Sequence, residues 1–285
     1  MHRNFSKILF SAALLFSLSV QANWHATEGS REQTKILNQV ETRVAQTQTP
    51  VVIFDLDSTL YDNRSRSVAI WREYGKLHKV ARLTHLKADQ ITSYVLEDYL
   101  VQSVKLDAQW VSDHLKKLKL YWAERFFSNA YVKYDQPLPG AVAYVKSLHK
   151  EGATIVYITG RDDGAMRAGT ESKFKHDGFP IGVVGTKLLM KSAAYNLDPK
   201  KFQSDGDYKA ALKKNDNQSK LDAIAEAKKL GTVVAAFDNE PAAINQYYQQ
   251  LHRDGKALAV WLDTDHFPNP EPLKKDVVSI AGFKR

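Results

Sequence analysis

The stretch Val51-Val-Ile-Phe-Asp-Leu-Asp-Ser-Thr-Leu60 joins four apolar residues to two acids that stand one residue apart. An apolar run of this kind is typical of a strand buried on both faces of a parallel sheet. Asp55 and Asp57 follow at its end, where like charges raise each other's pKa and cost free energy unless a cation or a reaction uses them. The stretch therefore predicts a central strand with a chemical site at its carboxyl end.

The rest of the chain alternates between strands and helices. Apolar runs predict strands at 154–158, 233–237 and 257–262, and residues 181–184 are a further candidate strand. Helices are predicted between Gly140 and Gly152 and over 221–230. Gly152 and Gly231 follow them and fit helix termination. This order favours an α/β fold with a Rossmann-like doubly wound parallel sheet, in which a site lies at the carboxyl ends of the strands.

Two segments lie outside this alternation. Residues 23–50 are predicted to be an N-terminal helical segment, with Ile36, Val40 and Val44 four residues apart. Residues 62–134 contain no proline and predict an all-helical insertion, with an apolar stripe at Val111, Leu115, Leu118, Trp122 and Phe126. The α/β core is then predicted to comprise residues 51–61 and 135–285.

Residues 1–22 have the pattern of a signal peptide. Arg3 and Lys7 precede an apolar run from Ile8 to Val20, and Val20-Gln21-Ala22 fits the cleavage rule. The run is short for a membrane span, so an uncleaved anchor is the alternative. The chain has no cysteine and therefore no lipobox or disulfide framework. We expect a bacterial protein that is periplasmic or secreted, with no membrane association after cleavage.

The net charge of +8 falls to about +6 once residues 1–22 are removed. No run of five or six basic residues is present, and no cysteine–histidine finger is possible. Nucleic acid is therefore not an expected partner, whereas a positive surface suits either solubility or an anionic substrate.

Polar clusters begin where three of the apolar runs stop. They are Asp55-Leu-Asp57-Ser-Thr59, Thr159-Gly160-Arg161 and Asp238-Asn239-Glu240, and Lys220 stands at the start of the helix that leads into the third strand. Carboxylates from two strand ends make an oxygen-rich site suited to Mg²⁺, and a lysine and a hydroxyl beside them suit a phosphate.

With these residues the sequence resembles the haloacid dehalogenase (HAD) superfamily of aspartyl phosphotransferases. The first motif of that superfamily, Asp-x-Asp-x-Thr, is matched by residues 55–59, the second by Thr159, the third by Lys220 and the fourth by Asp238. The resemblance covers residues 50–60 and 135–265. It implies a type 1 cap at 62–134, which closes over the site and selects the substrate.

The resemblance also implies roles. Asp55 attacks phosphorus to form an aspartyl-phosphate, and Asp57 protonates the leaving alcohol and then activates water. Thr159 and the amide of Gly160 hold the phosphoryl oxygens, and Lys220 neutralises charge. The implied Mg²⁺ ligands are the Asp55 carboxylate, the Asp57 backbone carbonyl and the Asp238 carboxylate. An acid at Asp57 favours phosphate chemistry over dehalogenation.

Several assignments have alternatives. Lys209 and Lys191 compete with Lys220, and Glu240 either holds metal waters or caps the helix that begins at Pro241. Arg161 contacts substrate or, as we favour, pairs with an acid. Asp263, Asp265 and His266 are either a metal site or, as we favour, turn residues. The insertion aromatics either form a stacking surface or, as we favour, pack in the core; they are Trp71, Tyr74, Trp110, Trp122 and Phe127.

The favoured function is an exported Mg²⁺-dependent phosphatase that acts on small phosphorylated substrates. One alternative is another HAD enzyme, such as a nucleotidase, a phosphotransferase or a phosphonatase with its Schiff-base lysine among Lys76, Lys87 and Lys116. The other is a non-catalytic binding protein, which has no chemical need for Asp55, Asp57, Thr159 and Asp238 together.

Overall fold

The computed structural model describes residues 29–197, 201–202, 204–251, 257–267 and 270–285. Its centre is a six-stranded parallel sheet in the order β5-β4-β1-β6-β7-β8. The strands are β1 (Pro50–Phe54), β4 (Thr154–Asp162), β5 (Thr186–Lys191), β6 (Thr232–Asp238), β7 (Leu258–Leu262) and β8 (Val278–Ile280). The predicted doubly wound α/β fold is confirmed.

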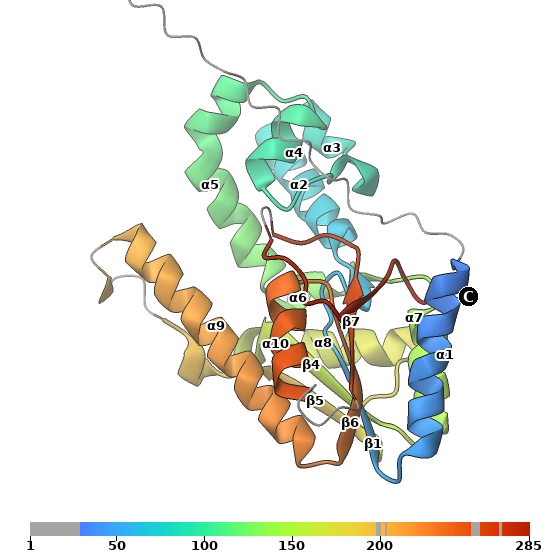
Figure 1. The fold of residues 1–285 in the computed structure, drawn as a ribbon. Helices are drawn as coiled ribbons and strands as arrows, with labels where there is room; N and C mark the ends of the chain where they lie inside the picture. The colour runs from blue at the N-terminus through green and yellow to red at the C-terminus, as the bar shows by residue number, and fades with distance from the viewer. Residues whose placement is uncertain (1–28, 198–200, 203, 252–256, 268–269) are drawn as a thin grey trace, which may run out of the picture.

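Helices cover both faces of this sheet (Figure 1). They are α1 (Arg31–Gln46), α7 (Ala141–Lys150) and α8 (Asp163–Asp177) on one face, and α9 (Asp205–Lys228) and α10 (Pro241–Leu251) on the other. In β1, Val52 and Phe54 pack towards α1 and α7, whereas Val51 and Ile53 pack towards α9 and α10. Both faces of β1 are buried, which explains its unbroken apolar run.

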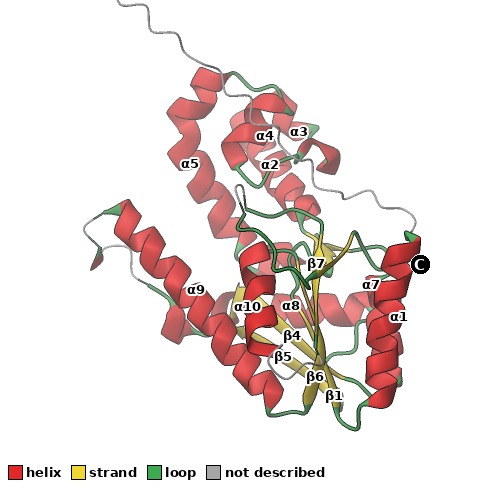
Figure 2. Ribbon diagram, in the orientation of Figure 1, coloured by secondary structure: helices red, strands yellow, loops and turns green. Residues whose placement is uncertain are grey.

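The helical insertion lies between β2 (Tyr61–Asp62) and β3 (Gln136–Pro137), which pair as a short antiparallel ribbon. Its elements are α2 (Arg64–His78), α3 (Ala81–Thr84), the 3₁₀ turn η1 (Ala88–Gln90), α4 (Leu96–Gln102), α5 (Ala108–Phe126) and α6 (Asn129–Val132). Figure 2 shows helices and loops throughout this part of the molecule. The predicted stripe faces inward on α5, because Val111, Leu118 and Phe126 are buried in it.

The structure corrects three expectations about the core. Residues 181–184 are not a strand; the edge strand β5 starts at Thr186, after Gly182 and Gly185, both of which have positive φ. Helix α9 begins at Asp205 rather than near residue 221, so Lys220 lies well inside it and not at its start. Strand β8 was not predicted.

The N-terminal helix is confirmed as α1, and its apolar residues Ile36, Val40 and Val44 are buried. The 16 residues of α1 follow Ser30, whose hydroxyl accepts a hydrogen bond from the amide of Gln33 at 3.0 Å. The predicted signal peptide, residues 1–22, lies outside the described residues. Within the described part of the chain, every helix is too short or too polar to cross a membrane.

Candidate active site

The carboxyl ends of β1 and β6 bring the first and fourth sequence motifs together. The amide of Asp55 donates to the carbonyl oxygen of Phe237 at 2.9 Å, which extends the pairing of the two strands by one residue. One turn later, the hydroxyl of Thr59 donates to the Asn239 side-chain oxygen and accepts from the Asn239 amide, both at 3.1 Å. These contacts fix the two aspartate-bearing loops against each other.

Lys220 connects the two buried carboxylates of these loops. Its Nζ donates to Oδ2 of Asp238 at 2.6 Å and lies 3.5 Å from Oδ1 of Asp55. Burial alone would lower the pKa of Lys220, but the carboxylates of Asp238 and Asp55 raise it well above its ordinary value. Lys220 is therefore held as a cation beside both acids.

The competing lysines have other surroundings. Nζ of Lys191 donates to Asp216 at 2.6 Å, on α9, while the side chain of Lys209 lies outside the described residues. Geometry thus brings Lys220 to Asp55 and Asp238, and directs Lys191 elsewhere.

The surroundings of Asp55 disfavour the charged form of its carboxyl. Burial raises its pKa well above the usual range, the neighbouring carboxylate of Asp238 raises it further, and Lys220 opposes both effects. Asp238 is itself fully buried, and its Oδ1 accepts the amide of Glu240 at 2.9 Å. Two hard carboxylates with one lysine between them are a donor set that fits Mg²⁺. Asp55 and Asp238 are the side chains that would hold it.

Asp57 faces a different group of partners. Its carboxylate accepts two hydrogen bonds of 2.8 Å from Nε and Nη2 of Arg161, one of 3.2 Å from Arg66 and one of 3.3 Å from Asn63. Burial alone would raise the pKa of Asp57, but the guanidinium groups of Arg161 and Arg66 hold it well below its usual range. The expected pairing of Arg161 with an acid is confirmed.

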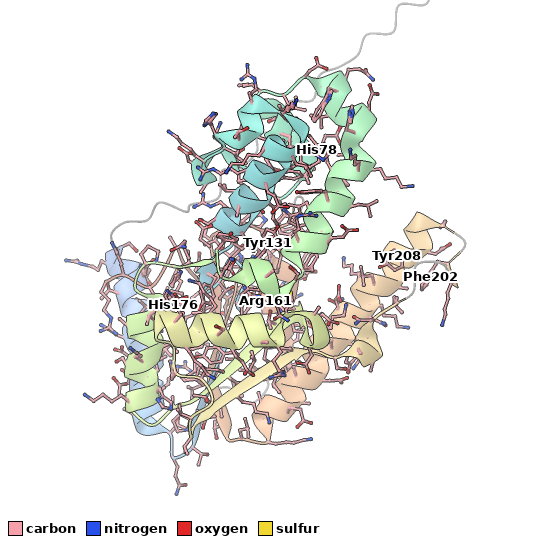
Figure 3. All side chains as sticks on the ribbon, turned by 180° about the vertical axis from the view of Figure 1, so that it is seen from behind. His78, Tyr131, Arg161, His176, Phe202 and Tyr208 are labelled. Carbon is pink, nitrogen blue, oxygen red and sulfur yellow. The ribbon has the colours of Figure 1, made fainter. Side chains whose placement is uncertain are left out.

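Arg161 and Arg66 also share a second acid, Asp135. Nε of Arg66 donates to Asp135 at 2.7 Å, and Nη2 of Arg161 donates to it at 2.8 Å. The side chains of Arg66 and Asp135 are fully buried, and that of Arg161 is 2% exposed. Figure 3 shows Arg161 near the place where α6 meets α8. Since Arg66 follows the entry to the insertion and Asp135 precedes its exit, the network links both junctions to Asp57.

The second motif lies near the end of β4, beside β1 in the sheet. Thr159 is 5% exposed, and its hydroxyl accepts the amide of Arg161 at 3.2 Å. Gly160 is exposed, and a side chain there would meet no atom within 4 Å. The Cα of Gly160 therefore faces open space.

A loop after β7, residues 263–267, lies against both aspartate-bearing loops. The hydroxyl of Thr264 donates to the carbonyl oxygen of Ser58 at 2.5 Å, and the Asn239 side chain donates to the carbonyl oxygen of Asp265 at 2.5 Å. The carboxylate of Glu240 accepts the amide of Phe267 at 3.3 Å. The Glu240 side chain thus binds this loop, while burial and Asp238 raise its pKa to about 7.

The possible metal cluster at Asp263, Asp265 and His266 is not formed. Among the described residues, no three histidine or acidic side chains are grouped so that they could hold a metal ion. Nδ1 of His266 lies 2.9 Å from the carbonyl oxygen of Phe267. Burial raises the pKa of Asp265 to about 6.

Tyr94 extends from the insertion to this loop. It lies between η1 and α4, and its ring packs against that of Phe267 in a tilted arrangement, with 4.2 Å between centroids and 43° between ring planes. Withdrawal of the hydroxyl from water, and then the carboxylates of Glu240, Asp265, Asp57 and Asp55, raise the pKa of Tyr94. Tyr94 thus contacts the loop whose Phe267 amide is bound by Glu240.

The aromatic residues singled out in the insertion are mostly structural. Trp71 and Tyr74 are buried in its core, Trp110 and Trp122 are partly buried against that core, and only Phe127 is exposed. Core packing, the favoured reading, holds for the first four. The insertion aromatic that contacts the 263–267 loop is Tyr94, which sequence reasoning missed because an isolated tyrosine in a polar loop carries no periodic signal.

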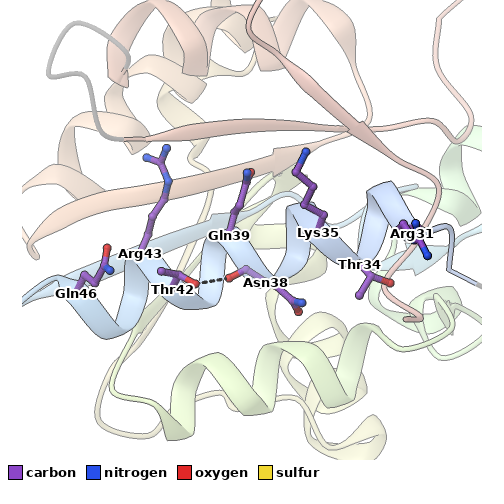
Figure 4. Close-up of a pocket in the computed structure, with 8 residues that line it drawn as sticks. All are labelled: Arg31, Thr34, Lys35, Asn38, Gln39, Thr42, Arg43 and Gln46. Atoms are coloured by element: carbon purple, nitrogen blue, oxygen red, sulfur yellow. Dashed lines mark hydrogen bonds between the residues drawn. The ribbon is translucent and has the colours of Figure 1, made fainter.

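A hollow of about 570 Å³ runs along the surface of α1 (Figure 4). Its lining residues are Arg31, Thr34, Lys35, Asn38, Gln39, Thr42, Arg43 and Gln46. None of the residues at the strand ends lines it, so it is separate from that cluster.

Comparison with known proteins gives the family. A model of the haloacid dehalogenase-like hydrolases matches residues 49–242. No curated protein matches the chain in sequence.

Similar solved structures include a HAD-superfamily hydrolase from Ehrlichia chaffeensis (14% identity, 82% of this chain and 91% of that one, TM-score 0.39). A haloacid dehalogenase-like hydrolase from Streptococcus pneumoniae is 15% identical, with 81% of this chain and 93% of that one covered and a TM-score of 0.38. The class C acid phosphatase from Bacillus anthracis with tungstate bound is 13% identical, with 89% of this chain and 83% of that one covered and a TM-score of 0.34. On the family match, which covers more than half of its length, the chain belongs to the haloacid dehalogenase-like hydrolases.

Proposed function

We propose that this hydrolase is a Mg²⁺-dependent phosphatase that cleaves small phosphomonoesters through an aspartyl-phosphate on Asp55. The observation that carries the proposal is the convergence of Asp55 and Asp238 on Lys220, with Asp57 two residues from Asp55. A bound Mg²⁺ would supply electrostatic stabilisation of the phosphoryl group in such a site.

Each of these side chains then has its own role in the reaction. Asp55 attacks phosphorus as the bond to the leaving oxygen breaks, while the Thr159 hydroxyl, the Gly160 amide and Lys220 bind the phosphoryl oxygens. Asp57 first takes up a proton from solvent, gives it to the leaving alcohol and then, as a carboxylate, takes a proton from the water that hydrolyses the intermediate. Both oxygens of Asp57 accept arginine donors here, so proton transfer follows a turn of this carboxyl away from at least one arginine.

The insertion acts as a cap that admits small esters and excludes water, because Tyr94 contacts the core beside the site. The phosphonatase alternative is not favoured, since Lys76, Lys87 and Lys116 are all exposed, whereas a Schiff-base lysine is desolvated in a pocket. Residues 1–22 direct export to the periplasm or beyond. Cell fractionation with and without these residues tests that part.

The central test is hydrolysis of a panel of phosphomonoesters by wild type, Asp55→Asn and the surface control Asp113→Asn, with Mg²⁺ or with a chelator. We expect turnover by wild type and control only, dependent on Mg²⁺. Mass spectrometry of the acid-quenched protein should find phosphate on the peptide that contains Asp55. Equal turnover by Asp55→Asn would exclude the aspartyl-phosphate mechanism.

A further inference from the structure

Tyr94 and Phe267 form an aromatic pair that bridges the insertion and the core. The rings are in contact, yet 44% of Tyr94 and 56% of Phe267 remain exposed. Large aromatic surface that stays in contact with water costs free energy that a planar ligand would recover. The pair is therefore a candidate surface for stacking.

The position of Phe267 is fixed relative to the site. Its own amide is bound by Glu240, two residues after Asp238, and Thr264 of the same loop is bound to Ser58, between Asp57 and Thr59. A ring placed on this loop keeps its distance from the reacting groups. This anchoring is what a specificity residue requires.

Tyr94 belongs to the insertion. Arg66, on α2, donates to Asp57 from the insertion, whereas Tyr94, between η1 and α4, contacts Phe267 of the 263–267 loop. A leaving group that extends from a phosphoryl group on Asp55 towards the 263–267 loop would meet these two rings.

We propose that Tyr94 and Phe267 form the leaving-group subsite and select phosphomonoesters whose alcohol carries a planar aromatic ring and no second negative charge. This inference rests on the proposed phosphatase function. Nucleoside monophosphates and aryl phosphates fit this description. The preference against further charge comes from Glu240, whose carboxylate accepts the amide of Phe267 at 3.3 Å and would repel another phosphate beside this ring.

The competing explanation is that the pair only holds the insertion against the core. In that case, removal of either ring would impair every substrate by the same factor. A stacking subsite instead affects aromatic esters alone, by roughly 5- to 150-fold for one lost base–aromatic stack. The two explanations differ in a ratio of rates, which is insensitive to how much protein is folded.

The experiment measures kcat/KM for adenosine 5′-monophosphate, phenyl phosphate and glycerol 2-phosphate with wild type, Tyr94→Ala and Phe267→Ala. Phe127→Ala is the matched control, because Phe127 is an insertion aromatic of similar exposure, 51%, that packs on Trp122 and Phe126. We expect both site variants to lose at least about fivefold on the two aromatic esters and less than twofold on glycerol 2-phosphate. Phe127→Ala should match wild type on all three esters. Equal losses on all three esters, or no loss, overturn the proposal.

Two further measurements complete the test. Adenosine 3′,5′-bisphosphate should be hydrolysed with a lower kcat/KM than adenosine 5′-monophosphate; the reverse order removes the charge preference. An NMR titration with adenosine itself should show weaker binding to Tyr94→Ala than to wild type. If wild type hydrolyses no ester but binds adenosine in this Tyr94-dependent way, the phosphatase function fails and the subsite stands. Equal adenosine affinity in both proteins overturns the subsite, whatever the hydrolysis results.

Discussion

The guanidinium of Arg161 binds the carboxylate of Asp57 through two parallel hydrogen bonds of 2.8 Å each. The same guanidinium donates at 2.8 Å to Asp135, which also binds Arg66. Asp57, the residue assigned to proton transfer, is thus joined through arginines to the two junctions of the insertion. A movement of the insertion that displaces Arg66 changes the partners of Asp57.

Replacement of Asp135 by Asn is expected to destabilise the protein strongly. The buried cations Arg66 and Arg161 would then share Asp57 alone, and breaking a buried ion pair from one side typically costs about 3–5 kcal/mol. Urea unfolding of wild type and Asp135→Asn measures this loss. Because Arg66 contacts Asp135 directly, Arg66→Met combined with Asp135→Asn should cost less than the sum of the two single changes. Additive losses would contradict the coupling.

Asp57→Asn is expected to slow phosphoryl transfer in a way that depends on the leaving group. General acid catalysis contributes roughly 10²–10⁴-fold, and an alkoxide needs the proton more than a nitrophenolate does. We therefore expect kcat/KM to fall far more for glycerol 2-phosphate than for 4-nitrophenyl phosphate. A steady-state series of esters that spans leaving-group pKa checks this. Parallel losses across the series would place Asp57 in another role.

The sequence was sufficient to predict the central sheet and the strand ends that carry Asp55, Thr159 and Asp238, because each depends on a local apolar run followed by polar residues. Where local pattern was weak, prediction failed. Edge strand β5 is only partly buried, and the first half of α9 is polar.

The residues that surround Asp57 could not be predicted from the sequence, for a different reason. Arg66 and Asp135 are 69 residues apart, and nothing local to either marks a buried ion pair. A charged residue in sequence is by default solvated, and its burial follows only from tertiary packing around it. The pairing of Arg161 with an acid could be predicted, because Arg161 directly follows the second motif at a strand end.

Lys220→Met is expected to reduce kcat by about 10²–10³-fold, the loss seen when one preorganised charge-stabilising group is removed from a transition state. Its Nζ contacts both Asp55 and Asp238. Lys191→Met is the matched control, since Lys191 is a similarly buried lysine that binds Asp216 instead. Steady-state rates of the two variants, at equal folded fraction by circular dichroism, decide the assignment. Loss of activity in Lys191→Met with Lys220→Met unaffected would reverse it.

The insertion should carry an acid-sensitive contribution to stability centred on Glu73. Its carboxylate accepts hydrogen bonds from Tyr121 at 2.6 Å, from Arg125 at 2.8 Å and from Tyr131, which joins α2, α5 and α6. Burial acts in the opposite direction, but these donors lower the pKa of Glu73 from 4.5 to about 2.

A folded-state pKa below the unfolded one means that the unfolded chain binds the proton first as pH falls. The stabilisation is therefore fully present above about pH 4.5 and is lost progressively towards pH 2. Thermal melts of wild type and Glu73→Gln across this range should differ most at neutral pH and converge in acid. Because the site is partly exposed, added salt should reduce the difference through screening of the Arg125 pair. A difference in melting temperature that stays constant from pH 7 to pH 2 would show that the Glu73 charge contributes nothing.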